Sequence, residues 1–339
     1  MEIRTREPSW NEDLPVFASP AFLRCQSPES GWLVGGDGGT PRFALPYTVH
    51  AKARLRLLRL HSAPIRLGPD DPAGTATDAE QEFLDSLAAF LRTDLGVDLV
   101  AQPPTYVLFA RCPAGAVAAP FGSYRIDLGR DETALWEAVH SKHRNVIRNA
   151  QKNGVRIERG PQWRATAHRF LAETMARSDM LFESRREFER TLDALGGNVE
   201  VYAALAGDEP QGCAVIPFSR HSAHYLWGGG RDKPLLGALN LLQWEIIRDM
   251  RSRGVRTYDL VGARLKAPEG SKLEGIQRFK SRLGATLVEG LLWKLPLHPF
   301  RAHLYERLWR LRNWRSAGRA GDIIDQERAR LRREHGAPN

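Results

Sequence analysis

Two stretches of similar design decide the fold: LVGGDGGTPRFALPY at Leu33–Tyr47 and LAGDEPQGCAVIPF at Leu205–Phe218. In each stretch a Gly-Asp turn is followed, nine residues after its aspartate, by a proline and an aromatic residue. The aspartates are Asp37 and Asp208, and apolar residues flank both turns. Short apolar runs on either side of a turn built from Gly, Asp or Pro are typical of a β-hairpin. We therefore expect two equivalent hairpins.

The segments after the two hairpins also share one order: an apolar strand, a loop, a helix closed by glycine and a further strand. After the first hairpin, RLRLLRL precedes a helix that is opened by Thr77 and Glu80 in capping-box spacing and ends at Gly96. After the second, AHYLWGGG is expected to form one strand, and the next helix ends at Gly254. A series of matches this long indicates duplication of one domain.

Elements around the second hairpin extend the pattern to β, α, α, β, β, β, α, β, α, β, the order of the GNAT acyltransferase fold by analogy. The expected fold class is α/β, with two tandem GNAT-like domains, no coiled-coil arm and a C-terminal helical tail. We place the domains at residues 1–127 and 128–295, and a basic tail at 296–339 that packs on the first domain. The other expected elements are strands 154–158 and 285–293, helices 163–178, 185–195 and 272–283, and one long helix, 132–152, that joins the domains.

The composition is that of a globular protein from a reducing compartment. The chain has 339 residues, enough for two cores, with 42% hydrophobic and 26% charged residues. No apolar run reaches the roughly 18 residues that a membrane span needs. Cys25, Cys112 and Cys213 are isolated, without the spacing of a disulfide framework or a zinc site. We expect a cytoplasmic protein without a metal or a cofactor.

The net charge of +9 favours phosphate-rich partners, and it is unevenly distributed. From Arg301 onward the chain has ten arginines and five acidic residues. One interpretation of this tail is a solvated helix with Leu304, Leu308 and Leu311 on one face. The other is a surface for RNA or for the inner face of a membrane. A DNA partner is not expected.

Three further stretches resemble a known family. They are LWEAVHSKHRNVIRNAQKNGV at the domain junction, YLWGGG with LNLLQWEIIRDMRSRGVRTYDLVGA, and EGIQRFKSRLGATLVE. In these stretches, from about Arg125 to Glu289, the chain is similar to the FemX/FemAB peptidyltransferases, which lengthen the peptide of bacterial cell-wall precursors. The resemblance implies aminoacyl-tRNA as the donor and an anionic acceptor, a nucleotide-linked or lipid-linked peptide, held in a cleft. The chain departs from the family in lacking a charged heptad insert and a clear acceptor motif near its start.

The resemblance also implies a catalytic pair. Phe279 and Lys280 stand in QRFKSRLG, on the expected helix 272–283. In the family the lysine of such a pair faces the reaction centre and the aromatic residue supports it. A cation there would stabilise the oxyanion that forms when an amine attacks an ester. The alternative interpretation is a surface lysine.

A second group of candidates is basic. Arg144 and Arg148 lie four residues apart and so share a helix face, with Lys142 close by. Guanidinium groups bind two oxygens of a phosphate at once, which predicts a clamp for a pyrophosphate or an RNA backbone. A solvated basic face is the alternative.

The remaining candidates are polar or aromatic residues of the second domain. Ser184 and Arg185 would contact the acceptor, or form an ordinary N-cap followed by a surface arginine. Tyr225 and Trp227 alternate on the expected strand, so both would line the cleft or pack in the core. Asp259 ends a buried strand, where ligands bind in open α/β sheets, and would orient the acceptor amine or bond loop amides.

A different donor gives the rival hypothesis, an acyl-CoA-dependent N-acyltransferase of the GNAT type. The loop that binds the CoA pyrophosphate normally resembles Q/R-x-x-G-x-G/A, because glycines let backbone amides approach the phosphates. Here the corresponding loop reads RDKPLLGA, and Pro234 offers no amide. A binding module without activity is a third hypothesis.

Overall fold

The computed structural model describes residues 1–37, 40–52, 55–67, 76–303, 307 and 322–334. The chain forms two compact units. Unit 1 contains residues 1–10, 17–122 and 289–339, and unit 2 contains residues 11–16 and 123–288. Leu304, Leu308 and Leu311, the expected apolar face of the tail, lie outside the described residues.

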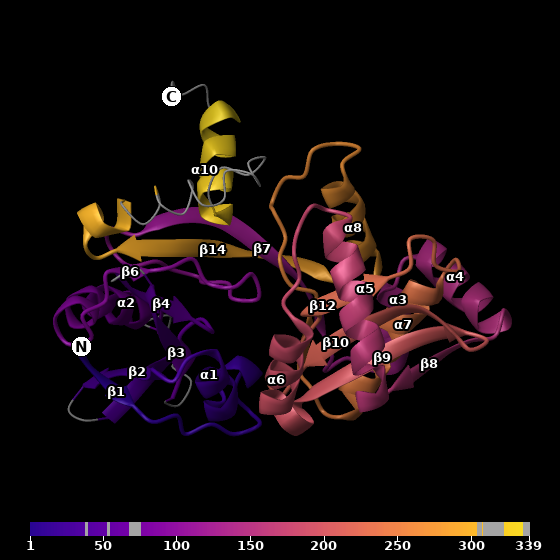
Figure 1. Ribbon diagram of the computed structural model, residues 1–339, viewed down its shortest axis with the longest axis horizontal. Coiled ribbons are helices and arrows are strands. Elements are labelled where there is room, and N and C mark those ends of the chain that lie inside the picture. Colours follow the sequence, from indigo (N-terminus) through magenta and orange to yellow (C-terminus); the bar gives the residue numbers. More distant parts are fainter. Residues whose placement is uncertain (38–39, 53–54, 68–75, 304–306, 308–321, 335–339) are drawn as a thin grey trace. The chain divides into compact units, whose positions relative to one another are not determined.

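Unit 1 is built on a mixed sheet in the order β1-β2-β3-β4-β6-β14-β7, with β5 beside β3 (Figure 1). The first expected hairpin is present as the antiparallel pair β2 and β3. Phe83 of α2 stacks on Phe43 of β3 at a ring-centroid distance of 5.4 Å, and the two rings belong to the apolar core of this unit. The elements are β1 (Glu2–Arg6), α1 (Pro20–Gln26), β2 (Ser30–Asp37), β3 (Thr40–Lys52), β4 (Leu55–Leu60), β5 (Ile65–Arg66), α2 (Ala76–Thr93), β6 (Leu99–Val100), β7 (Val117–Asp127), β14 (Thr286–Pro296) and α10 (Ile323–Glu334).

The helix α10 is held to unit 1 by charge and by apolar contact. The ammonium of Lys294 on β14 lies 3.1 Å from a carboxylate oxygen of Asp322 and 2.9 Å from one of Asp325. Ile324 is fully buried in a cluster with Phe121 of β7 and Leu292 of β14. The described end of the tail is therefore a packed helix and not a solvated one.

Removing both carboxylates around Lys294 is expected to destabilise unit 1. The lysine side chain is 7% exposed, so a variant with Asp322→Asn and Asp325→Asn leaves a buried cation without either ion pair. We expect the free energy of unfolding, measured by urea denaturation, to fall by about 3 kcal/mol. Lys294→Met should cost less, because it removes the buried charge itself. Equal stability of the double variant and the natural protein would contradict this prediction.

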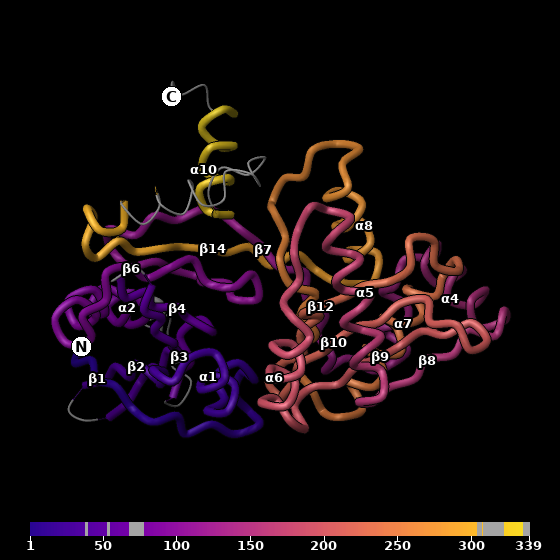
Figure 2. Tube along the Cα trace, viewed as in Figure 1, coloured from indigo at the N-terminus to yellow at the C-terminus, as the bar shows by residue number. Residues whose placement is uncertain are grey.

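Unit 2 contains a four-stranded sheet in the order β12-β10-β9-β8 and a second group of strands, the C-terminal end of β7, then β13 and β11. The second expected hairpin is the antiparallel pair β9 and β10, which lie side by side in Figure 2. The elements are α3 (Glu132–Ala138), α4 (Ser141–Lys152), β8 (Val155–Arg159), α5 (Arg164–Ala176), α6 (Arg185–Leu195), β9 (Val199–Ala206), β10 (Glu209–Pro217), β11 (Ala223–His224), β12 (Trp227–Gly230), α7 (Ala238–Ser252), β13 (Thr257–Asp259) and α8 (Lys272–Arg282).

Helices cover both faces of this four-stranded sheet. Because side chains alternate along a strand, Val201 and Ala203 of β9 pack with α5 and α6, whereas Tyr202 and Ala204 pack with α4 and α7. All four of these residues are buried. One face of the sheet therefore supports both α4 and α7.

Two of the expected elements are wrong. The long helix 132–152 breaks into α3 and α4, because Val139 and His140 adopt extended backbone. The imidazole Nδ1 of His140 accepts a hydrogen bond from the amide of Lys142, and the amide of His140 donates to the carbonyl of Arg282. The amides of His140 and Lys142 thus have hydrogen-bond acceptors outside the helical pattern, which a continuous helix would have supplied from its own carbonyls.

The expected strand AHYLWGGG is also divided. Ala223–His224 pairs with β13 as β11, and Trp227–Gly230 pairs with β10 as β12, so the two halves join different groups of strands. The amide of Tyr225 donates to the carbonyl of Asp259, which ends the pairing with β13. The expected helices 163–178, 185–195 and 272–283 are confirmed as α5, α6 and α8 within two residues at each end.

Candidate active site

A buried lysine lies beside the end of β13. Lys280 is in the last turn of α8, which begins after Ser271, whose hydroxyl accepts a hydrogen bond from the amide of Glu274. Its side chain turns inward, so the residue is only 8% exposed. The ammonium donates to the carbonyl of Val261 and, at 2.9 Å, to the carbonyl of Gly262. The interpretation of Lys280 as a surface residue is therefore wrong.

The backbone that receives this ammonium is strained. Val261 and Gly262 both have left-handed conformations, with φ of 42° and 47°. For a β-branched residue this conformation is unfavourable by about 1–2 kcal/mol. The carboxylate of Asp259 stabilises it, because Oδ1 accepts a hydrogen bond from the amide of Val261 at 2.8 Å. Strained backbone of this kind is concentrated at functional sites, where the surrounding structure holds it.

Asp259 is the centre of a buried polar cluster. It is 2% exposed, and its Oδ2 lies 2.8 Å from Nε of Arg125, while Oδ1 also accepts a hydrogen bond from the hydroxyl of Ser123. Both partners belong to β7, which pairs with β13. Sequence reasoning selected Asp259 but missed Ser123 and Arg125, because they lie 136 and 134 residues away along the chain.

Burial changes the acidity of the lysine. Desolvation lowers the pKa of Lys280 from 10.5 to about 8, and the nearby carboxylate of Asp259 opposes part of this shift. Burial favours the neutral amine, because a charged group loses hydration that the protein only partly replaces. The side chain is therefore mainly an ammonium at pH 7 and mainly a neutral amine above pH 8.

Phe279 is partly buried and packs on the core of unit 2. Its ring lies 5.4 Å from the imidazole of His143, centroid to centroid. Burial, with smaller effects of Arg282 and His140, lowers the pKa of His143 to about 4. The contact between this neutral imidazole and the Phe279 ring packs α8 on α4. The role of Phe279 in support of Lys280 stays a prediction.

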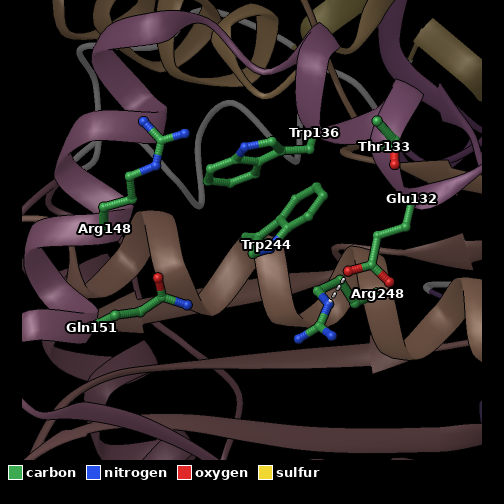
Figure 3. Close-up of a pocket in the computed structure, with 7 residues that line it drawn as sticks. All are labelled: Glu132, Thr133, Trp136, Arg148, Gln151, Trp244 and Arg248. Carbon is green, nitrogen blue, oxygen red and sulfur yellow. Dashed lines mark hydrogen bonds and ion pairs between the residues drawn. The ribbon is translucent and has the colours of Figure 1, made fainter.

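The structure gives Arg144 and Arg148 different surroundings. Arg144 donates through Nη1 to the carbonyls of Trp136 and Glu137, at 3.4 and 2.9 Å, and so satisfies the C-terminal end of α3. Arg148 instead lies with its guanidinium 5.5 Å from the ring centroid of Trp136. Lys142 lies exposed in the first turn of α4. The three residues remain candidates for phosphate binding, and Arg148 is the one of them that lines the pocket in Figure 3.

Ser184 and Arg185 have structural partners at the start of α6. The hydroxyl of Ser184 accepts from the amide of Glu187, whose carboxylate in turn accepts from the Ser184 amide, which together form a capping box. Arg185 lies 3.7 Å from Glu189, one turn along the helix. This geometry agrees with the interpretation of an N-cap followed by a surface arginine.

Tyr225 and Trp227 do not share the face of one strand, because the strand that was expected to carry both is divided. Trp227 packs against Phe182 and Phe188 in the cluster beneath α5 and α6. Tyr225 packs on the other core of unit 2, and burial raises its pKa to about 12. The two rings therefore belong to different apolar clusters, and their expected common surface is wrong.

The comparisons with known proteins agree with this fold. Residues 139–281 match the family model described as an acetyltransferase (GNAT) domain. A crystal structure of FemX is 13% identical and matches with a TM-score of 0.66, over 90% of this chain and 99% of that chain. A C-terminal domain of a putative lysylphosphatidylglycerol synthetase from Agrobacterium fabrum is 13% identical, with a TM-score of 0.49 over 82% of this chain and 87% of that chain. No curated protein matches the sequence.

The fold and the matched model define the class: this is a protein with a GNAT-type acyltransferase fold. Its overall architecture is FemX-like, as expected from the sequence. The matched GNAT domain supports an acyltransferase. Within the ranges that the structure describes, no helix combines the length and the apolar character that a membrane crossing requires.

Proposed function

We propose that this protein transfers an aminoacyl group from aminoacyl-tRNA to the amine of a cell-wall peptide precursor or a related acceptor. The observation that supports the proposal most is the buried ammonium of Lys280, held by two carbonyls beside the end of β13. The resemblance to FemX/FemAB peptidyltransferases gives the donor and the class of acceptor. In that family the lysine of the Phe-Lys pair faces the reaction centre, and Lys280 is the lysine of the matching pair in this chain.

In the proposed reaction the acceptor amine attacks the ester carbonyl of the donor. A C–N bond forms, the carbonyl oxygen becomes an oxyanion, and collapse of this intermediate breaks the ester C–O bond. The proton lost by the amine passes to the departing ribose oxygen, which leaves as a hydroxyl group. Lys280 uses two N–H groups for Val261 and Gly262, and its third has no partner among the residues described. That N–H donates to the oxyanion.

No side chain is assigned as a general base. An activated ester and a neutral amine react when they are held in alignment, so positioning supplies much of the rate. Asp259 is a positioning residue in this scheme. It holds Val261 in the left-handed conformation, and Val261 in turn provides one of the carbonyls that fix the ammonium.

The loop between β12 and α7 argues against acyl-CoA as the donor. Two of its amides already have protein partners: Arg231 donates to the carbonyl of Gln211, and Leu235 donates to the Gln211 side chain. Pro234 has no amide to offer. A CoA pyrophosphate is normally bound by free amides at this place, and these three positions have none to offer.

The pH dependence of turnover follows from the lowered pKa of Lys280. If the charged form stabilises the oxyanion, kcat at saturating acceptor should fall as the pH rises through about 8, because the ammonium is lost there. The measurement is kcat from pH 6 to pH 10 in the natural protein. A rate that increases steadily up to pH 10 would instead indicate that the neutral amine is the active form.

The decisive experiment supplies both donor classes. The protein is incubated with a pool of charged tRNAs and candidate amine acceptors, with and without RNase, and the extended product is detected by mass. We expect a product whose formation RNase abolishes. A parallel arm contains acetyl-CoA and no RNA, together with a calorimetric titration of acetyl-CoA. Micromolar affinity and an RNA-independent acylated product would overturn the proposal in favour of the CoA-dependent rival.

A further inference from the structure

A second feature of unit 2 is a pocket of about 460 Å³ on α3, α4 and α7. It shares none of its lining residues with the cluster around Lys280 and Asp259. Figure 3 shows Arg148 and Gln151 projecting from one side, an ion pair of Glu132 and Arg248 on the other, and two tryptophans between them. The pocket therefore combines aromatic surface with groups of both charges.

The aromatic part consists of Trp136 of α3 and Trp244 of α7. Their ring centroids are 4.7 Å apart and their planes are inclined by 55°, so the rings contact each other and leave no slot between them. Trp244 is 6% exposed and packs in the core of unit 2, whereas Trp136 is only partly buried. Trp244 thus supports Trp136, and Trp136 offers indole surface to a ligand.

The polar groups beside Trp136 are not satisfied within the protein. In the described part of the chain, Arg148 has no carboxylate partner and its guanidinium contacts only the face of Trp136, at 5.5 Å. The side-chain amide of Gln151 has no hydrogen bond to any residue that the structure describes. Across the pocket, by contrast, Arg248 is neutralised by Glu132 at 2.8 Å and by Glu245 at 3.0 Å.

We infer that this pocket binds an unpaired nucleotide, with its base against Trp136 and its phosphate on the guanidinium of Arg148. Bases stack on indole rings and on guanidinium planes, and an unpaired base exposes the edge that a side-chain amide recognises. The Gln151 amide, one turn from Arg148 on α4, provides a donor and an acceptor for that edge. The guanidinium of Arg148, which has no carboxylate partner among the described residues, provides paired donors for phosphate oxygens.

Such a nucleotide has two chemical sources, a free nucleotide or nucleotide-linked metabolite and a single-stranded end of RNA. Both present a planar base joined to a phosphate. The inference concerns binding alone and does not depend on the proposed transfer reaction. A test by binding therefore separates its failure from a failure of the proposed function.

The test is isothermal titration calorimetry of the full chain with four probes: AMP, UDP, the oligonucleotide ACCA and ribose 5-phosphate. We expect saturable binding of a nucleotide or of the oligonucleotide, and much weaker binding of ribose 5-phosphate, which lacks a base. Tighter binding of ACCA than of AMP and UDP assigns the site to RNA, and the reverse order assigns it to a free nucleotide. Equal binding of ribose 5-phosphate and the nucleotides would overturn the inference, as would no binding of any probe.

Variants locate the binding. Arg148→Met should weaken the affinity roughly 10- to 100-fold, because a charged hydrogen bond to phosphate is lost. Trp136→Leu should weaken it roughly 5- to 100-fold through loss of stacking. The matched control is Lys152→Met, which removes one charge from the same helix outside the pocket and should change the affinity less than about threefold.

Folding of each variant is checked by its thermal melt. Gln151→Ala is a second test, because it removes only the side-chain amide assigned to the edge of the base. It should change the ratio of the affinities for AMP and UDP. Affinities of Arg148→Met and Gln151→Ala that both equal that of the natural protein would overturn the inference.

Discussion

Replacing Lys280 by methionine is expected to lower kcat by about 10² to 10³. Methionine keeps most of the length of the side chain and removes the ammonium that donates to the oxyanion, and one such donor is worth about this factor. The KM for either substrate should change little, because the interaction is made only in the transition state. The measurement is steady-state turnover with the aminoacyl-tRNA and the acceptor identified by the product assay.

A second lysine on the same helix provides the control. Lys272 begins α8, and its ammonium donates to the hydroxyl of Ser178 at 2.7 Å on the surface of unit 2. Lys272→Met should keep near-normal turnover. The melting temperature of Lys280→Met should change by only a few degrees, because the lost bonds to Val261 and Gly262 are offset by relief of a buried charge. Near-normal turnover of Lys280→Met would show that the lysine has a structural role only.

Replacing Asp259 by alanine is expected to reduce both stability and turnover. The carboxylate accepts hydrogen bonds from Ser123, Arg125 and the amide of Val261, and all three donors lose their acceptor in the variant. Arg125 is 34% exposed and regains water, so we expect a loss of about 3 kcal/mol in the free energy of unfolding. Turnover should also fall, because the left-handed conformation of Val261 loses its support.

The matched control for Asp259 is an exposed aspartate that also pairs with arginine. Asp193 lies 2.6 Å from Arg164 on the surface of α6, and its side chain is mostly exposed. Asp193→Ala should change the free energy of unfolding by less than about 1 kcal/mol. Urea denaturation measures both variants. If Asp259→Ala were as stable as Asp193→Ala, the buried cluster would not support the backbone at Val261.

Local patterns in the sequence were sufficient for much of the fold. The hairpins around Asp37 and Asp208 and the helices α5, α6 and α8 were predicted from neighbouring residues only, and the structure confirms the strand pairs and the helices. Predictions failed where a distant partner overrides the local pattern. The break between α3 and α4 is one example, because the amide of His140 bonds to Arg282.

The same distinction applies to the candidate site. The sequence by itself determined that Lys280 belongs to a helix and that Asp259 ends a strand, because local patterns along the chain carry that information. Only the tertiary structure decided that this lysine is buried, that its ammonium meets the carbonyls of Val261 and Gly262, and that Arg125 faces Asp259. The physical reason is that burial and ion pairing depend on which distant segments pack together, and 134 residues separate Arg125 from Asp259.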